Sequence, residues 1–480
     1  MNTDLPLLSV FNNGIDSTIT RWCTPSIHPS VPRVRGIYEN DISISYHSLG
    51  NPSMNTGIFK KANELAAKAY GADHTLFGVN GSTGSNFMVL RALKNQLGPK
   101  MKMLAQRNIH KSISVAVEDY QIETEYLDPH YVDSLQIFAP NTIEEVLEGL
   151  KRSRANVLLV TNPTYEGLST DLKKLVKTVR AFDKNIIIFI DEAWGAHFPF
   201  SKEMPLCAMK AGADICVQSI HKQGSGLQQT SMIHWNDGRI DVTWLKDSYK
   251  SLMTTSPSFH MLASLDGSRY FMEHEGEEAI SRLVKLAETF RDRVNTSAKL
   301  KEKVTAIDCE DLRQNYCAHS DATKVLVHLE GFSGMELAKR LEEKYQIIVE
   351  KYEANNVLFI VTFQNTKADV EKTVAAIETE IKKMKPQTNH FPKFPNLIKK
   401  KMNSFQAKLA EKESVTIQEA EGRVAAEDVV PYPPGIPLCV KGEVIQPAHI
   451  NYLKELKKTK ELLTVVMVDE SVQTIKVVKE

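Results

Sequence analysis

The stretch from residue 157 to residue 197, VLLVTNPTYEGLSTDLKKLVKTVRAFDKNIIIFIDEAWGAH, decides the fold. It opens with the apolar run 157–160, continues through a helical pattern at 170–183, and returns to an apolar run at 186–190. Short apolar runs separated by a helix are typical of strands buried on both faces of a parallel sheet. A third such run follows at 213–217. The sequence therefore predicts an α/β fold, with a mostly parallel central sheet covered by helices and ligand-binding loops at the carboxyl ends of its strands.

Upstream of this stretch, residues 1–52 are punctuated by proline and glycine and show little periodicity, which indicates an N-terminal arm. Residues 53–266 are expected to form the large domain. It begins with a helix at 60–72, a strand and turn at 74–81, and a helix at 85–98.

Downstream, residues 267–388 are expected to form a smaller α+β domain, with a helix at 277–294 and strand-like runs at 324–330 and 356–363. Its last helix carries apolar residues at steps of three and four, namely Val370, Val374, Ile377, Ile381 and Met384. A proline-containing linker then leads to a C-terminal domain at 389–480. The run Pro431-Tyr432-Pro433-Pro434-Gly435 in that domain is interpreted as a rigid turn rather than a catalytic element.

The composition excludes several classes of protein. The 480 residues are 42% hydrophobic and 25% charged, so the chain is neither disordered nor a disulfide scaffold. Because 59 basic residues balance 59 acidic ones, no net field favours a nucleic acid or an anionic membrane. The six cysteines include no CxxC pair, and no metal site is expected. With no signal peptide and no long apolar span, we expect a cytoplasmic protein.

Three polar motifs follow predicted strands. Lys222 lies in the segment SIHK at 219–222, directly after the strand-like segment ADICVQ at 213–218, and Asp191 directly follows the run 186–190. The segment 80–85, NGSTGS, is a turn before a helix, where free backbone N–H groups favour a phosphate. Each motif alone has an ordinary alternative: a loop lysine, a helix cap or metal ligand, and simple capping.

Together the three motifs supply what pyridoxal phosphate requires. This cofactor needs a lysine amine for its Schiff base, an anion that keeps the pyridine nitrogen protonated, and an anchor for its phosphate. The sequence therefore predicts a pyridoxal 5'-phosphate enzyme.

At this point the chain resembles the bacterial ornithine/lysine/arginine decarboxylase family, which has the fold type I (aspartate-aminotransferase type) architecture. The resemblance covers most of the chain from about residue 50. It is carried, in order, by the segments VNGSTGSN, RNIHKS, VTNPTYEG, DEAWGAH, QSIHK, TTSPSFHMLASLD and VVPYPPGIPLCVKGEVI.

The resemblance implies a role for each matching residue. Lys222 would form the internal aldimine, Asp191 would pair with the pyridinium nitrogen, and His110 would stack on the cofactor ring. The phosphate would be held by Ser82, Thr83, Ser219 and His221. Trp194 would lie beside the ring, and Thr164 would face the site from another strand end. Thr255 and Ser256 would reach the phosphate of a partner subunit, which implies a homodimer or larger assembly with its active site at the subunit interface.

The implied reaction is decarboxylation of a basic L-amino acid through the Lys222 aldimine and a quinonoid carbanion. Arginine, which would give agmatine, is the favoured substrate. This preference comes from the amino acids that the family handles and not from any residue in this sequence. The cationic end of such a substrate requires a carboxylate. Four candidates are Glu166, Glu350, Glu419 and Glu443, and the sequence does not choose among them.

The arm departs from the family pattern, because the usual Pro-Gly-His-Lys segment is replaced by Thr-Pro-Ser-Ile-His-Pro at 24–29. The arm ordinarily lies near the active-site mouth. The change therefore leaves open an oxidase, in which the carbanion gives its electrons to O2. His28 is a candidate acid-base group, with a surface histidine as the alternative.

Two further hypotheses remain open. An aminotransferase would use the same lysine and aspartate, although the decarboxylase-like segments argue against it. A cofactor-free binding protein that has kept the fold is disfavoured because Lys222, Asp191 and His110 are all retained.

Overall fold

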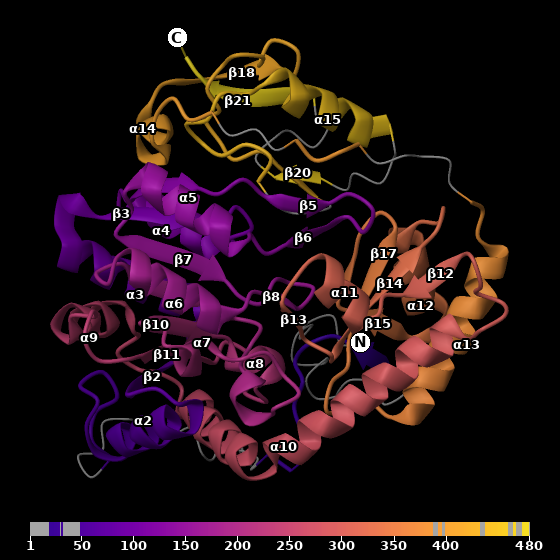
Figure 1. Cartoon of the computed structure of the whole chain (residues 1–480), viewed down its shortest axis with the longest axis horizontal. Helices are drawn as coiled ribbons and strands as arrows, with labels where there is room; N and C mark the ends of the chain where they lie inside the picture. The colour runs from indigo at the N-terminus through magenta and orange to yellow at the C-terminus, as the bar shows by residue number, and fades with distance from the viewer. Residues whose placement is uncertain are drawn as a thin grey trace, which may run out of the picture.

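The computed structural model describes residues 19–28, 30–31, 49–386, 392–395, 399–432, 437–458, 464–466 and 473–479. Figure 1 shows three parts: a large domain in indigo to magenta, a smaller one in salmon and orange, and a C-terminal domain in yellow above the large one. The six cysteines are all unpaired thiols. Within the described ranges, no helix combines the length and the apolar character that crossing a lipid bilayer demands.

A seven-stranded sheet forms the centre of the large domain. Its order is β2 (His74–Gly78), β11 (Ser231–Trp235), β10 (Ile215–Gln218), β9 (Ile187–Asp191), β7 (Val157–Thr161), β3 (Lys102–Ala105) and β4 (Glu123–Tyr126). Strands β10, β9, β7, β3 and β4 pair in parallel, whereas β11 runs antiparallel to both neighbours. The predicted α/β fold with a mostly parallel sheet is therefore confirmed.

Helices cover both faces of this sheet. They are α2 (Gly57–Tyr70), α3 (Gly81–Leu97), α4 (Lys111–Asp119), α5 (Ile143–Ser153), α6 (Leu172–Phe182), α7 (Ala208–Ala211), α8 (Ile220–Gln223) and α9 (Val242–Leu252), with 3-10 turns at Gly98–Lys100 and Phe198–Phe200. Successive residues of a strand point to opposite faces. Thus Phe189 belongs to the core beside α3, while Ile188 and Ile190 belong to the core beside α5 and α6.

The small domain is built on an antiparallel sheet of β12 (Val304–Ala306), β14 (Lys324–Leu329), β17 (Asn356–Ile360) and β16 (Lys351–Tyr352). Its helices are α11 (Cys309–Asn315), α12 (Gly334–Tyr345) and α13 (Lys367–Lys383). Helix α10 (Phe259–Asn295) runs from the large domain to the small one (Figure 1). The boundary expected after residue 266 therefore lies inside a continuous helix, which keeps burying apolar side chains such as Leu265 and Phe271.

The described part of the N-terminal arm is fixed to the small domain. Strand β1 (Thr20–Trp22) pairs in parallel with β15 (Ile347–Val349). The indole of Trp22 is fully buried and donates a hydrogen bond of 2.8 Å to Thr373 Oγ1. Short ladders elsewhere join β8 (Leu168–Ser169) to β13 (His319–Ser320), and β5 (His130–Val132) to β6 (Ile137–Ala139).

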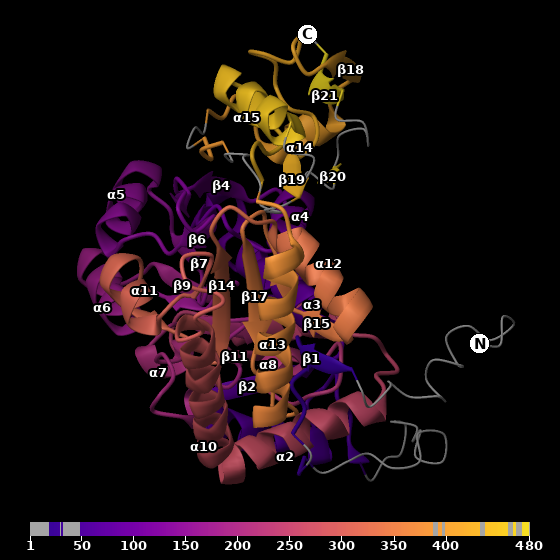
Figure 2. The same ribbon diagram turned by 90° about the vertical axis from the view of Figure 1, so that its right-hand side faces the viewer.

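The C-terminal domain packs on the large domain near α4, as both views show (Figures 1 and 2). Its elements are α14 (Ser404–Leu409), β18 (Lys412–Thr416), β19 (Val430–Tyr432), α15 (Pro447–Lys458), β20 (Thr464–Val466) and β21 (Thr474–Val478). Its core includes Phe138 of the large domain. In the run interpreted as a rigid turn, Pro431 lies in β19, while Pro433, Pro434 and Gly435 lie outside the described residues.

Candidate active site

Asp191 and Lys222 meet at the carboxyl edge of the sheet. Asp191 is the last residue of β9 and pairs in register with Val217 of β10, and the chain then enters α8, which carries Lys222. The Asp191 carboxylate is buried and accepts hydrogen bonds from Asn86 Nδ2 at 3.3 Å and from the Ala193 N–H at 3.2 Å. No described lysine or arginine forms an ion pair with it. A buried carboxylate held only by neutral donors is suited to receive a cation.

The amine of Lys222 lies 3.7 Å from the centre of the Trp194 ring. Burial lowers the pKa of Lys222 to about 7, although Asp191 opposes the shift, and the nearby ammonium of Lys324 adds to it. A lysine with a depressed pKa is partly neutral near pH 7. Its nitrogen can therefore act as a nucleophile toward a carbonyl carbon.

His110 is the N-cap residue of α4 and keeps part of its surface exposed. Its Nδ1 lies 2.8 Å from Ser112 Oγ and accepts a 3.2 Å hydrogen bond from the Ser112 N–H. Burial of its polar atoms lowers the pKa of His110, Asp191 counteracts this, and Lys222 reinforces it. The contacts with Ser112 orient the ring, which offers a flat surface for stacking.

The first turn of α3 faces the start of α8. Ser219 Oγ donates a 2.8 Å hydrogen bond to Ser82 Oγ, and both side chains are buried. The N-cap residue Asn80 makes no side-chain cap bond, and the first turn has no acidic residue. The leading N–H groups of a helix have no intrahelical acceptor, and the helix dipole there favours an anion.

His221 and Thr83 border the same turn. His221 Nδ1 lies 2.8 Å from the Thr230 carbonyl oxygen, and a Cβ added to Gly81 would lie 4.0 Å from His221 Cε1. Thr83 is exposed. The structure thus brings together the four residues predicted to hold a phosphate.

Trp194 and Thr164 have different surroundings. The buried Trp194 packs on the Tyr165 ring with centroids 4.7 Å apart, and the ammonium of Lys324 lies 4.3 Å from its centre. Thr164 is buried, and its polar atoms close the turn before β8: its N–H donates to the Leu168 carbonyl, and its Oγ1 accepts from the Leu168 N–H.

His28 lies apart from the cluster around Lys222. Its ring stacks on Phe271 at 4.5 Å and meets Phe363 edge-on at 5.4 Å. It borders a groove of about 1120 Å³ along α10. Burial lowers the pKa of His28, and Arg282 adds to the shift. The arm nevertheless touches the site nearby, because the Ser26 N–H donates a 2.9 Å hydrogen bond to the Lys222 carbonyl.

The four candidate glutamates occupy different places. Glu166 is buried and paired with Lys351 at 2.7 Å. Glu443 is buried in a bidentate pair with Arg107, both contacts being 2.7 Å. Glu419 is exposed in the C-terminal domain and accepts from the N–H and Oγ1 of Thr416. Of the four, only Glu350 is half-buried and close enough to Lys222 for its charge to raise the pKa of that lysine.

Thr255 and Ser256 lie in the exposed segment between α9 and α10. The Ser256 N–H donates to Thr254 Oγ1 at 3.3 Å. In a single subunit, therefore, neither hydroxyl belongs to the group formed by Ser82 and Ser219.

Sequence reasoning missed two residues of this site. Asn86, which donates to Asp191, lies one helical turn after Ser82, so the i, i+4 spacing could have found it. Lys324 is buried at the start of β14 and donates a 2.6 Å hydrogen bond to the Tyr165 carbonyl. A lysine before an apolar strand is common, and nothing near it in the sequence marks it.

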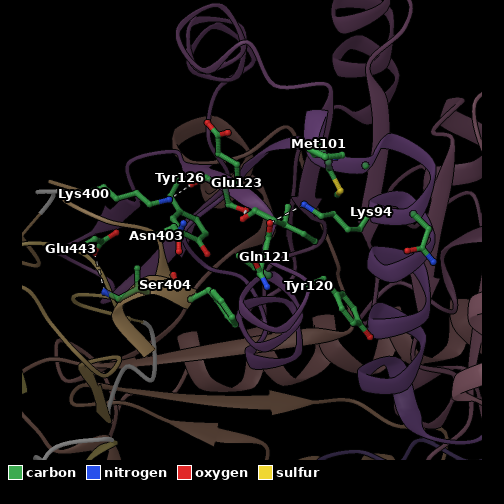
Figure 3. Close-up of a pocket in the computed structure, with 18 residues that line it drawn as sticks. Lys94, Met101, Tyr120, Gln121, Glu123, Tyr126, Lys400, Asn403, Ser404 and Glu443 are labelled. Carbon is green, nitrogen blue, oxygen red and sulfur yellow. Dashed lines mark hydrogen bonds between the residues drawn. The ribbon is translucent and has the colours of Figure 1, made fainter. Parts of the chain in front are cut away.

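A second pocket, of about 780 Å³, lies between the large and C-terminal domains (Figure 3). Lys400 projects toward the β4 side of this pocket, where its amine donates a 2.9 Å hydrogen bond to the Thr124 carbonyl. Across the described ranges, no three His, Cys, Asp or Glu side chains gather as ligands for a metal.

Comparison with known families matches almost the whole chain. Residues 35–369 match the family described as Orn/Lys/Arg decarboxylase, major domain, and residues 384–463 match its C-terminal domain. The chain is 35% identical over 407 residues to an arginine decarboxylase of Bacillus subtilis, covering 83% of this chain and 81% of that protein. It is 34% identical over 435 residues to one of Bacillus anthracis, covering 88% and 85%.

Solved structures show the same fold. A lysine decarboxylase of Francisella novicida superposes with a TM-score of 0.78 at 19% identity, covering 92% of this chain and 75% of that one. The constitutive lysine decarboxylase of E. coli gives 0.76 at 21% identity with the same coverage. From its matches over both domains, the chain belongs to the Orn/Lys/Arg decarboxylase family.

Proposed function

We propose that this protein is a pyridoxal phosphate-dependent decarboxylase of a basic L-amino acid, with arginine as its first candidate substrate and agmatine as the product. The observation that carries the proposal is the pairing at the sheet edge: a buried Asp191 without a cationic partner among the described residues, beside a Lys222 amine whose pKa is lowered to about 7. The arginine decarboxylase names of relatives that match over four-fifths of both chains support the choice of reaction and substrate.

The residues present fit the cofactor. The Asp191 carboxylate would pair with a protonated ring nitrogen. This ion pair would offset the free-energy cost of burying the negative charge of Asp191. The turn of Ser82, Thr83, Ser219 and His221 would hold the phosphate at the start of α3. His110 would lie flat against the ring, with Trp194 and Thr164 on its other sides.

The bound cofactor supplies an electron-withdrawing ring that stabilises the negative charge left at Cα when CO2 departs. The chain's own residues prepare this step. Lys222 offers a neutral amine that exchanges with the α-amine of the substrate. Asp191 keeps a positive charge on the ring nitrogen in a site sheltered from water, where an ion pair is stronger. The His110 ring would restrict the movement of a cofactor ring stacked on it.

The oligomeric part of the proposal concerns the exposed segment after α9. Thr255 and Ser256 would complete the phosphate site of a second subunit, so that the functional unit is a homodimer or a larger assembly. Light scattering of the loaded protein measures this directly, and a monomer that binds cofactor and turns over would contradict it.

The test of function is an incubation of the loaded protein with L-arginine, L-lysine and L-ornithine separately, following CO2, dissolved oxygen and organic product together. CO2 and an amine with oxygen unchanged support the decarboxylase. Oxygen consumption with an aldehyde or keto acid would support the oxidase instead, and turnover only with an added keto acid would support the aminotransferase. The family matches favour the first outcome.

A further inference from the structure

The turn that follows Lys222 has a strained backbone. Just after the short helix α8, Ser225 has a φ of +67°, in the left-handed region that residues with a side chain rarely adopt. Ser225 is also buried, so its surroundings have to hold this conformation. Strained backbone of this kind gathers at functional sites, and here it directly follows the helix that carries the proposed reactive lysine.

The N-terminal arm supplies the contacts that hold this turn. The Ser225 hydroxyl donates a 3.0 Å hydrogen bond to the Ser26 carbonyl and accepts one of 3.3 Å from the His28 N–H. The Ser26 N–H donates to the Lys222 carbonyl at 2.9 Å. Because the last carbonyls of a helix have no partner within it, this bond fixes the main chain of Lys222 itself.

Ser26 is held in place from several directions. It is buried, and its Oγ accepts a 3.0 Å hydrogen bond from the Phe363 N–H of the small domain. On one side of it, the buried Trp22 belongs to strand β1, which pairs with β15. On the other side, the His28 ring stacks on Phe271 at 4.5 Å. The arm segment is therefore fixed at both ends, which lets it support the turn.

We infer that Ser225 is a positioning residue for Lys222, and that it acts by joining the turn after that lysine to the arm at Ser26. The inference rests on the proposed function only in taking the Lys222 amine as the reactive group. The arm then holds the site through its main chain. His28 contributes its N–H to Ser225, while its ring packs on Phe271 and takes no part in acid–base chemistry.

The test is Ser225→Ala, which removes the hydroxyl and leaves a Cβ in the left-handed conformation. Without its contacts with the arm, the turn should relax and admit water to the Lys222 amine. In the cofactor-free protein, capture of Lys222 by an aldehyde and borohydride should then shift from a midpoint near pH 7 to one about 0.5–1 unit higher, a fraction of what full burial produces. The charged and titratable groups that face this amine remain unchanged, namely Asp191, Lys324, Glu350 and His110.

Kinetics of the loaded enzyme give a second reading. We expect kcat for L-arginine to fall about 10- to 100-fold, since misplacing a reacting group by about 1 Å can cost that much. KM should change by less than about twofold, because Ser225 contacts the arm and not the proposed substrate. The matched control is Ser248→Ala on α9, which removes a buried hydroxyl that has no hydrogen-bond partner among the described residues. It should leave the midpoint and both constants unchanged.

Ser225→Gly covers the case in which the alanine variant does not fold. Glycine adopts a positive φ without strain, so its midpoint should lie between those of the unmodified protein and Ser225→Ala. The inference is overturned if the variant that folds keeps the original midpoint, if Ser248→Ala shifts it as far, or if glycine shifts it further than alanine. The capture needs neither cofactor nor substrate, so it reads the position of Lys222 independently of turnover. If no amino acid releases CO2 from the loaded protein, it is the proposed function that fails.

Discussion

The two sides of the active site are assembled in different ways. The sheet-edge group, Ser82, Asp191, Ser219 and Lys222, comes from strand ends and helix starts of one domain. The small-domain group, Lys324, Glu350 and Lys351, comes from another sheet and is completed by Thr24 of the arm, 326 positions away from Glu350 in sequence. The first group would provide the cofactor chemistry, which the family shares. The second group depends on contacts of the small domain with the arm and with the large domain.

The largest expected effect lies on the sheet edge. Lys222→Ala removes the nucleophilic amine, so we expect turnover to fall by about 10³-fold or more. The absorbance band of the cofactor bound through lysine should vanish as well, while Glu350→Gln should keep it. A Lys222→Ala variant that retains both the band and turnover would break the distinction between the two groups.

Asp191→Asn keeps the shape of the side chain but removes its charge. We expect kcat to fall by about 10²- to 10³-fold, the usual cost of losing one preorganised electrostatic contact. KM for arginine should change little, because the proposed role of Asp191 is to pair with the cofactor and not with the substrate. Stopped-flow and steady-state kinetics separate the two constants, and a change confined to KM would contradict the assignment.

The contact between the domains is expected to affect stability rather than chemistry. Glu443→Gln leaves the guanidinium of Arg107 buried with a weakened partner, so we expect the protein to lose about 3–5 kcal/mol of stability. Urea unfolding of the loaded enzyme measures this loss. The double variant with Arg107→Met should recover part of it, and equal loss in both would show that the ion pair is not the cause.

The pH dependence of Lys222 tests the electrostatics. In the cofactor-free protein, capture of Lys222 by an aldehyde and borohydride should have its midpoint near pH 7, because burial lowers the pKa of Lys222 to about 7. The unfolded chain keeps that proton up to about pH 10.4, so stability should rise with pH between these two values.

The smallest expected effect is that of Lys324, in the small-domain group, on the pKa of Lys222 in the sheet-edge group. Lys324→Met removes an ammonium that helps to lower the pKa of Lys222, so the midpoint of capture should move to higher pH. Lys324→Arg keeps a cation and should restore the original midpoint. Identical midpoints in all three proteins, read by mass spectrometry of the labelled peptide, would show that the two groups do not interact.

The sequence predicted the sheet-edge group because local rules determine it. Buried parallel strands read as apolar runs, and the polar residue that follows each run must lie at the same edge. Asp191 and Lys222 were found in this way, and His110 through the family pattern. The small-domain group follows no such rule. Lys324 reaches Trp194, and Glu350 reaches Tyr165, only through the packing of a second domain. The pairing of Glu443 with Arg107 joins residues 336 positions apart.

The parallel ladder between β1 and β15 also bears on how the protein is made. Each residue of β1 precedes its partner in β15 by 327 positions. At a synthesis rate of about 5–20 residues per second, Trp22 leaves the ribosome roughly 16–65 s before its partner strand exists. During that interval the Trp22 side chain lacks the rings of Phe290 and Phe359, on which it packs in the folded protein. The closing of the chain's beginning onto its later part must therefore wait until residue 349 has been made, and the same closure delivers Thr24 to Glu350.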